Sequence, residues 1–157
     1  FFLIPIPYLR FKISMARIKL KFQSPYLFKV KIPVRITDLN YGNHLANDKV
    51  LSIIHEARMK FFHHFGYSEM DLGGVNSIMA DVAIEYKNQA FYDDELFIEI
   101  GVQDVERVSF DLFYRISTSE KLIALAKTGI VTFDYHKNKV VEIPAEVREK
   151  FNQAESL

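Results

Sequence analysis

The chain contains no cysteine, and this absence excludes several kinds of site at once. Without thiols there is no disulfide bond, thiolate nucleophile, cysteine-based zinc site or iron–sulfur cluster. The absence is compatible with a reducing compartment, and we expect a cytoplasmic location. A long apolar run is also missing. The opening segment FFLIPIPYLRFKIS is shorter than the roughly 20 apolar residues of a membrane span, and Pro5 and Pro7 interrupt it, so we expect no membrane partner.

Acidic residues are absent from the first 37 positions, which carry eight basic residues. The whole chain is balanced at 20 basic and 20 acidic residues, so positions 38–157 hold the other 12 basic residues and every acid. The charge is therefore polarised along the sequence. The basic segment is either a phosphate-facing patch or the solvated face of a strand. Because the chain is neutral overall and shows no recognised nucleic-acid motif, we expect no nucleic-acid partner.

The length of 157 residues and a hydrophobic share of 49% predict one domain with a sizeable core. We expect residues 25–157 to form this domain and residues 1–24 to be an N-terminal extension and lead-in. Met15 followed by Ala16 reads like a natural translation start, so residues 1–14 are interpreted as an upstream extension. That extension is either a poorly ordered tail or an apolar segment that docks on a partner subunit.

The strongest secondary-structure signal is a helix over residues 46–65, where apolar side chains recur every three or four positions. Asn47 or a neighbour is expected to cap its start, and Gly66 stands where a left-handed C-terminal cap is common. Pro33 cannot donate a backbone hydrogen bond, so its strand is expected at a sheet edge or bulge. Alternation and turn signals predict strands over residues 25–37, 77–89, 94–104, 108–118 and 122–136, and a last short helix over 144–152.

Short turns join the last four predicted strands, which implies antiparallel pairing because parallel crossovers need about a dozen residues or more. The fold class is therefore α+β, with an antiparallel five-stranded sheet against one long helix. One helix can cover only one sheet face, and strand residues such as Ile123 and Ile130 leave little polar surface for the other. We therefore expect association with further copies of the chain, as a homodimer or tetramer.

The densest group of chemically useful side chains runs DLNYGNHLAN from Asp38, followed by Glu56-Ala57-Arg58 on the helix. As isolated residues, Asp38 and Asn40 are more often turn formers that hydrogen-bond their own backbone. His44 alone would more often be a loop residue, and Glu56 alone a solvated helix residue. Together, however, their spacing resembles the hotdog-fold acyl-CoA thioesterases, near the 4-hydroxybenzoyl-CoA thioesterase group. Members often read Asp-x-Asp-x-x-Gly-His-Val-Asn-Asn and then Glu-Ala-Arg, and the resemblance covers about residues 25–150.

The resemblance implies a hotdog fold, hydrolysis of an acyl-CoA or acyl-carrier thioester, and a site between subunits. It implies no cofactor, because CoA would be part of the substrate. Two positions depart from the family pattern: Asn40 replaces the second acid, and Asn43 replaces the glycine before the histidine. An asparagine side chain cannot act as nucleophile or base, so that role does not carry over to Asn40.

Thioester hydrolysis needs an activated water or carboxylate and donors for the developing oxyanion. A helix N-terminus offers free N–H groups, so the backbone near Ala46 and Asn47 is the expected oxyanion hole. Glu56 is the best carboxylate for a base, yet it lies nine residues, or roughly 13 Å, along the helix from Asn47. A partner subunit's loop is therefore expected to bring the groups together, with Asn40 and His44 orienting water or polarising the carbonyl. The catalytic candidates are Asp38, Asn40, His44, Asn47 and Glu56.

Substrate-binding candidates are weaker. Arg107 and Ser109 lie on the turn where family members place phosphate contacts, although a solvated hairpin explains them equally well. Tyr86 and Phe91 are expected to line an apolar acyl tunnel at the subunit interface. Phe61 and Phe62 are further lining candidates, and core packing accounts for them as well.

We assign no metal site. His55-Glu56 is not followed by a second histidine at zincin spacing, and the loop from Asp38 has Lys49 where a calcium loop needs its bidentate glutamate. Because Asn40 replaces the family's acid, a non-catalytic acyl-thioester binding protein is the main alternative function. A hotdog hydratase or dehydratase ranks lower, since the chain has no His-Phe-Pro stretch.

Overall fold

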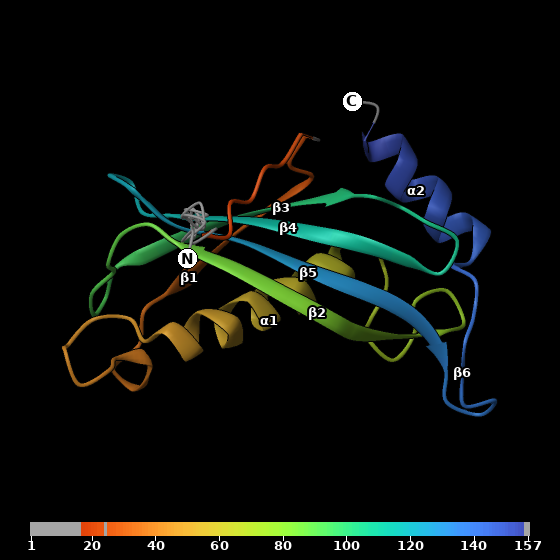
Figure 1. Ribbon diagram of the computed structural model, residues 1–157, viewed down its shortest axis with the longest axis horizontal. Coiled ribbons are helices and arrows are strands. Elements are labelled where there is room, and N and C mark those ends of the chain that lie inside the picture. Colours follow the sequence, from red (N-terminus) through yellow and green to blue (C-terminus); the bar gives the residue numbers. More distant parts are fainter. Residues whose placement is uncertain (1–16, 24, 156–157) are drawn as a thin grey trace, which may run out of the picture.

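The computed structural model describes residues 17–23 and 25–155, which form a twisted antiparallel sheet against one long helix (Figure 1). Helix α1 spans Asn47–His64, helix α2 spans Ala145–Glu155, and the 3-10 turn η1 spans Ile36–Asp38. The strand order is β1-β3-β4-β5-β2, with β6 added beside β5. The strands are β1 Phe28–Pro33, β2 Asn76–Tyr86, β3 Glu95–Gln103, β4 Ser109–Ser117, β5 Leu122–Asp134 and β6 Lys139–Val140. The predicted α+β hotdog architecture is confirmed. The short strand β6 was not anticipated, nor was η1, which occupies the end of the strand predicted over residues 25–37.

Helix α1 forms where the apolar repeat predicted it, because its stripe of large side chains can be buried against the sheet. Ile54, Phe61 and Phe62 are fully buried there. Gly66 has a φ of 82°, the left-handed conformation expected just after the helix. Of the two expected possibilities, Asn47 or a neighbour, the N-cap residue is the neighbour Ala46, which gives no side-chain hydrogen bond, and Asn47 is the first helical residue.

Strand β1 lies at one edge of the sheet, as Pro33 predicted, because an edge strand can lack one hydrogen-bond donor. Strand β2 forms the other edge and is 11 residues long. Its Met79 and Val82 are among the exposed large apolar side chains. An unpaired edge of this length leaves backbone donors and acceptors free for another chain.

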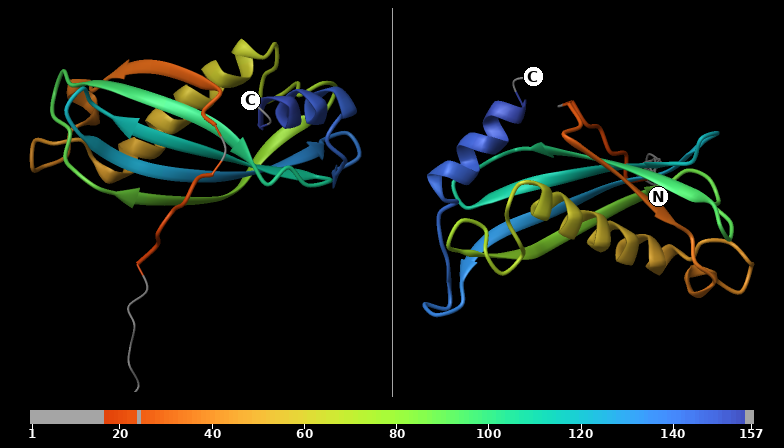
Figure 2. Two further views of the ribbon diagram at one scale, coloured as in Figure 1. Left: turned by 90° about the horizontal axis from the view of Figure 1, so that it is seen from above. Right: turned by 180° about the vertical axis from the view of Figure 1, so that it is seen from behind.

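The sheet face opposite α1 is partly covered by the chain itself. We call residues 17–23 the strap; this segment crosses the face from the β1 side toward β2 (Figure 2). The Phe22 ring stacks on Phe113 at 5.1 Å between centroids, and it lies over Gly101, which has no side chain to obstruct it. At the far side, the Leu20 N–H donates to Glu85 of β2. The lead-in therefore supplies part of the cover that the sequence led us to expect from another copy of the chain, and association with such a copy stays a prediction.

Helix α2 closes one end of the core. Its Phe151 is fully buried and contacts the rings of Phe61, Phe65 and Phe110. Among the described residues, no helix has the length and apolarity needed to cross a membrane. Residues 1–14, which the sequence suggested as an upstream extension, lie outside the described residues.

Candidate active site

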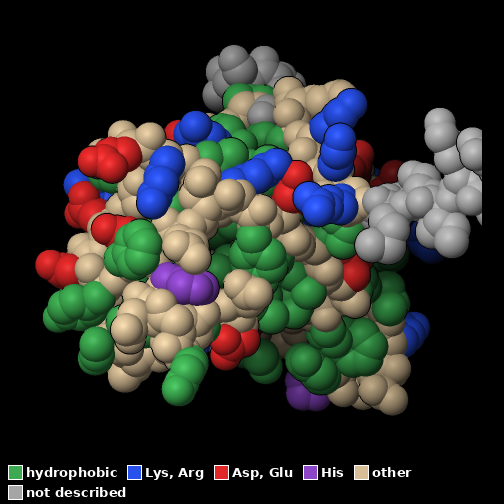
Figure 3. Space-filling model, turned by 60° about the vertical axis from the view of Figure 1, so that its left-hand side comes forward, with side chains coloured by type: hydrophobic (Ala, Val, Ile, Leu, Met, Phe, Trp, Pro, Cys, Tyr) green, Lys and Arg blue, Asp and Glu red, His purple; other side chains and the backbone are tan. Residues whose placement is uncertain are grey.

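A hollow of about 210 Å³ lies beside the loop that leads into α1. The loop is fastened to the β2–β3 connection, since the Leu45 N–H donates to the Ala90 carbonyl. Figure 3 turns this end of the molecule toward the viewer and shows Lys and Arg side chains gathered above apolar ones. The hollow is lined by His44, Leu45, Asn47, Val50, Tyr86, Lys87, Asn88, Gln89, Ala90 and Ile123. Three of the predicted site residues, His44, Asn47 and Tyr86, therefore share one cavity.

Asp38 is engaged in holding the loop. Its side chain is 2% exposed and accepts hydrogen bonds from the Arg35 backbone N–H at 2.9 Å and from the Arg35 guanidinium at 3.0 Å. The Arg35 hydrogen bond outweighs burial and holds the pKa of the Asp38 carboxyl below its usual range. The Asp38 carbonyl also accepts the Ala46 N–H. Asp38 does not line the cavity, so its observed contacts are those of a turn-forming residue.

Asn40 fixes the orientation of the His44 ring. The Asn40 Oδ1 accepts the N–H groups of Gly42 and His44, at 2.9 and 3.4 Å, which turns its Nδ2 toward His44 Nδ1 at 3.3 Å. The same Nδ1 lies 3.3 Å from the Leu45 carbonyl. A neutral imidazole can use only one of these contacts, because Nδ1 accepts from Asn40 when unprotonated and donates to Leu45 when protonated. The substitution at position 40 thus bears directly on which His44 nitrogen carries the proton.

The second departure from the family pattern also has a backbone explanation. Asn43 has a φ of 59°, in the left-handed region that glycine adopts most easily. Asparagine is one of the few other residues that tolerate this conformation. Asn43 can therefore replace the usual glycine without a different loop path.

The start of α1 offers free donors, although not the pair that the sequence suggested. The Ala46 N–H is taken by Asp38, so that half of the predicted oxyanion hole is wrong. Within the described part of the chain, the N–H groups of Asn47 and Asp48 have no hydrogen-bond acceptor, as expected for the first turn of a helix. Tyr86 donates its hydroxyl to the Asn47 carbonyl at 3.0 Å, which places its ring against this helix end.

Glu56 faces a different hollow. It lies with Arg35, Ser52 and Met59 along a groove of about 380 Å³ between α1 and the β1 edge. Its carboxylate is exposed and pairs with Lys60 at 3.2 Å. Within one chain, the structure therefore does not bring Glu56 to the His44 cavity, in keeping with the separation expected along the helix.

The other substrate-binding candidates are also dispersed within one chain. Ser109 pairs with Val131, whereas Tyr86 pairs with Ala124 at the opposite end of β5, seven residues or roughly 24 Å away. Arg107 is exposed beside Ser109 and pairs with Glu142 at 2.8 Å. Phe91 follows Ala90 but is 47% exposed, with Lys121 Nζ 5.3 Å above its ring.

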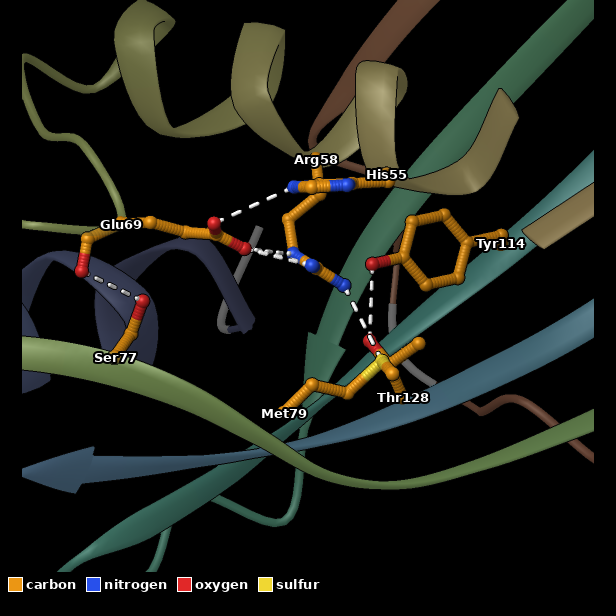
Figure 4. A network of polar contacts seen from close by, with 7 residues as sticks. All are labelled: His55, Arg58, Glu69, Ser77, Met79, Tyr114 and Thr128. Carbon is orange, nitrogen blue, oxygen red and sulfur yellow. Dashed lines mark hydrogen bonds and ion pairs between the residues drawn. The ribbon is translucent and has the colours of Figure 1, made fainter. Parts of the chain in front are cut away.

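Sequence reasoning missed a buried polar network beneath α1 (Figure 4). Arg58 is only 4% exposed, and its Nε and Nη2 both donate to one Glu69 oxygen, at 3.0 and 2.7 Å. Next to it, the Tyr114 hydroxyl lies 3.0 Å from Thr128, and burial raises the pKa of Tyr114 to about 12. The sequence did contain an indication of this network. Arg58 falls four residues after Ile54 on the apolar stripe of the helix, where a charged side chain needs a buried partner.

No group of three or more His, Asp or Glu side chains is arranged to hold a metal ion within the described part of the chain. The side chains that line the cavity supply an imidazole, amides, a phenol and the Lys87 ammonium, and the start of α1 adds helix N–H groups. These groups can donate hydrogen bonds to a carbonyl oxygen on which negative charge develops.

The sheet order and the single central helix define a hotdog-type α+β fold. The family model of the thioesterase-like superfamily matches residues 34–151, and the chain belongs to that superfamily. A curated relative from Aquifex aeolicus (strain VF5), which carries a provisional esterase name, is 28% identical over 127 residues, covering 80% of this chain and 96% of the relative.

Solved structures show the same fold. A hypothetical protein from Aquifex aeolicus superposes with a TM-score of 0.73 at 23% identity, covering 80% of this chain and 99% of that one. The 1,4-dihydroxy-2-naphthoyl-CoA thioesterase from Synechocystis superposes with a TM-score of 0.70 at 19% identity, covering 82% and 95%. At these identities the superpositions establish the fold and leave the residue roles to the geometry of this chain.

Proposed function

We propose that the chain is an acyl-CoA thioesterase that hydrolyses a thioester to a free acid and CoA at a site between two subunits. The observation that carries the proposal is the cavity at the start of α1, where His44, Asn47 and Tyr86 meet in a member of the thioesterase-like superfamily. The proposed location is cytoplasmic, and the substrate is an acyl-CoA or an acyl thioester on a carrier. A structural relative is a thioesterase for an aryl-CoA, which favours CoA.

In this proposal, the thioester carbonyl oxygen points at the helix start and accepts from the Asn47 N–H. Asn40 donates to His44 Nδ1, which leaves the proton on Nε2 as a second donor to the carbonyl oxygen. Both donors gain strength as negative charge develops on that oxygen. Asn40 is thus a positioning residue. Its amide donates a hydrogen bond to His44 Nδ1, which an ionised carboxylate, the family's group at this position, could not do because it has no proton to donate.

The base in this proposal is Glu56 of the second subunit. It removes a proton from water, the resulting hydroxide adds to the carbonyl carbon, and the carbon–sulfur bond breaks as the carbonyl reforms. The CoA thiolate leaves and takes up a proton. The exposed position of Glu56 supports this role, because its side chain can enter a cavity of another copy without disturbing its own core. The free edge of β2 beside Tyr86 supports pairing of two copies.

Cleavage of a panel of acyl-CoAs, followed with a thiol reagent, tests the activity. We expect thiol release above the buffer rate for at least one acyl or aryl group. The Glu56→Gln variant should lose most of this rate while its unfolding curve stays unchanged, and Glu149→Gln on α2 serves as the matched control. A folded wild-type protein that cleaves no member of the panel would refute the proposal.

Asn40 supports one other function, a non-catalytic acyl-thioester binding protein, because the family's loop acid is missing. Calorimetric titration of acyl-CoA distinguishes the two, since this alternative expects saturable binding without turnover. It also expects that Asn40→Asp, which restores the family's acid, creates hydrolysis that the wild type lacks. Turnover by the wild type would eliminate the alternative.

A further inference from the structure

The strap lies before the residues that the family model matches, so its function has to be argued from this chain alone. Over residues 19–22, its side chains alternate between two directions. Leu20 and Phe22 are partly buried against the sheet, whereas Arg17, Lys19 and Lys21 are exposed. An extended segment with this alternation presents a row of cations to solvent, spaced about 6.5 Å apart.

The strap is held in place by contacts of Phe22 and Gln23 with the middle of the sheet and of Leu20 with β2. Phe22 stacks on Phe113, and the Gln23 N–H donates to Gln103 of β3 at 3.3 Å. Toward β2, the Leu20 N–H donates to a Glu85 oxygen at 3.1 Å. The strap is thus part of the folded surface, and its cations have a defined position beside the end of β2.

The strap ends next to the candidate active site. Arg17 and Ile18 line a surface hollow of about 470 Å³ together with Tyr86 and Lys87 of the β2 end. Tyr86 and Lys87 also line the cavity that contains His44. A ligand bound by its thioester in that cavity can therefore pass over Tyr86 and Lys87 and reach the strap without crossing the sheet.

Basic side chains outnumber acidic ones around this hollow, and Lys19 lies close enough to Glu85 to interact with its charge. Within the described residues, Arg17, Lys19 and Lys21 form no ion pair closer than 4 Å, and Glu85, the carboxylate among the hollow's lining residues, is paired with Lys87. By contrast, Lys29 and Lys31 of β1 are paired with Glu99 and Glu95. Arg17 and Lys87 line the hollow with Glu85, and Lys19 and Lys21 follow along the strap, so cations exceed carboxylates here. Such an excess attracts an anion with several charges.

We propose that the strap is the phosphate-binding arm of the site, with Arg17, Lys19 and Lys21 contacting the phosphates of the CoA moiety while its thioester lies in the His44 cavity. This inference rests on the proposed function, because it takes CoA as the substrate's carrier. The long pantetheine arm of CoA separates its phosphates from the thioester, and the path over Tyr86 and Lys87 accommodates such a separation. The strap would then distinguish CoA from carriers that lack the nucleotide.

Calorimetric titration with CoA, dephospho-CoA and pantetheine tests this inference without requiring turnover. The variant is Lys19→Gln with Lys21→Gln, and the control is Lys29→Gln with Lys31→Gln, which removes the same charge from paired positions. We expect the strap variant to bind CoA about tenfold more weakly and with less salt dependence, while pantetheine binds all three proteins alike. The control should bind CoA as the wild type does.

Equal affinity of the wild type and the strap variant for CoA would overturn the inference, and so would an equal loss for pantetheine, which has no phosphate. Preserved unfolding curves exclude a folding defect in either variant. The experiments distinguish a failure of the proposed function from a failure of this inference. Phosphate-dependent binding without hydrolysis would refute the thioesterase and leave the strap's role standing, whereas hydrolysis with an unaffected strap variant would refute only the strap.

Discussion

Replacing Gly101 by alanine should detach the strap from the sheet while leaving the hotdog domain folded. A Cβ at position 101 would lie 2.0 Å from Phe22 Cζ and 2.8 Å from the Pro25 carbonyl oxygen. Neither separation is tolerable, so the Phe22 ring has to leave its place on Phe113. Because the strap lies on the surface of the sheet, it can move away instead of deforming β3.

Because the strap can leave the sheet, the expected loss in the free energy of unfolding is limited to the contacts that the strap makes. Full burial of a phenylalanine contributes about 1.5–3 kcal/mol, and Phe22 is only partly buried, so Phe22→Ala should cost about 1–2 kcal/mol. Gly101→Ala should cost at least this much, because it removes the same contact and also forces the Pro25 backbone to shift. In the Phe22→Ala background, Gly101→Ala should cost less than it does in the wild type, since only the clash with the Pro25 carbonyl remains.

Urea denaturation of the wild type, the two single variants and the double variant measures this cycle. Tryptic cleavage after Lys19 and Lys21 gives an independent readout, because a detached strap is a better protease substrate. We expect non-additive costs and faster cleavage in Gly101→Ala. Additive costs, or a strap cleaved as slowly as in the wild type, would show that Phe22 does not hold the strap on Gly101.

Three further substitutions test the packing around the site. Arg58→Met should cost about 3 kcal/mol in urea denaturation, because it leaves Glu69 without its cation, and the partial exposure of Glu69 keeps the cost at the low end for a buried pair. Asp38→Asn should cost about 2 kcal/mol at neutral pH; since the pKa of Asp38 is lowered by Arg35, this difference should vanish as the pH falls through that pKa. Tyr114 has its pKa raised to about 12, so the unfolded state ionises first and stability should fall by about 2–3 kcal/mol between pH 10 and 12, a fall that Tyr114→Phe should abolish. An unchanged alkaline unfolding profile in Tyr114→Phe would contradict the burial of that hydroxyl.

Local chemistry made much of the fold predictable from the sequence. The apolar repeat of α1, the glycine that ends it and the proline in β1 each act within a few residues, and each has its expected place. The strap was not predictable in the same way, because its anchor joins Phe22 to Gly101 and Phe113 across most of the chain. Nothing near Phe22 in the sequence indicates that a glycine 79 positions later makes room for its ring.

The sequence identified candidate site residues, but it could not predict their contacts. His44, Asn47 and Tyr86 line one cavity, and their roles there stay predictions. Asp38 forms an ion pair with Arg35 and so stabilises the loop, because a carboxylate in a turn next to a cation is most stable when the two are paired. Glu56 lies apart from the cavity because of the helix rise between it and Asn47, so the roles of Glu56, Arg107 and Ser109 stay predictions that depend on a second copy of the chain.

A mixing experiment tests the proposed interface site most directly. His44→Ala and Glu56→Gln should each be inactive alone. If each site takes His44 from one subunit and Glu56 from the other, a hybrid dimer has one intact site and one site with both substitutions. Equal amounts of the two variants, co-refolded, should then recover about a quarter of the wild-type rate, because half the dimers are hybrids and each has one working site. No recovery from a mixture shown to contain hybrids would contradict a site shared between subunits.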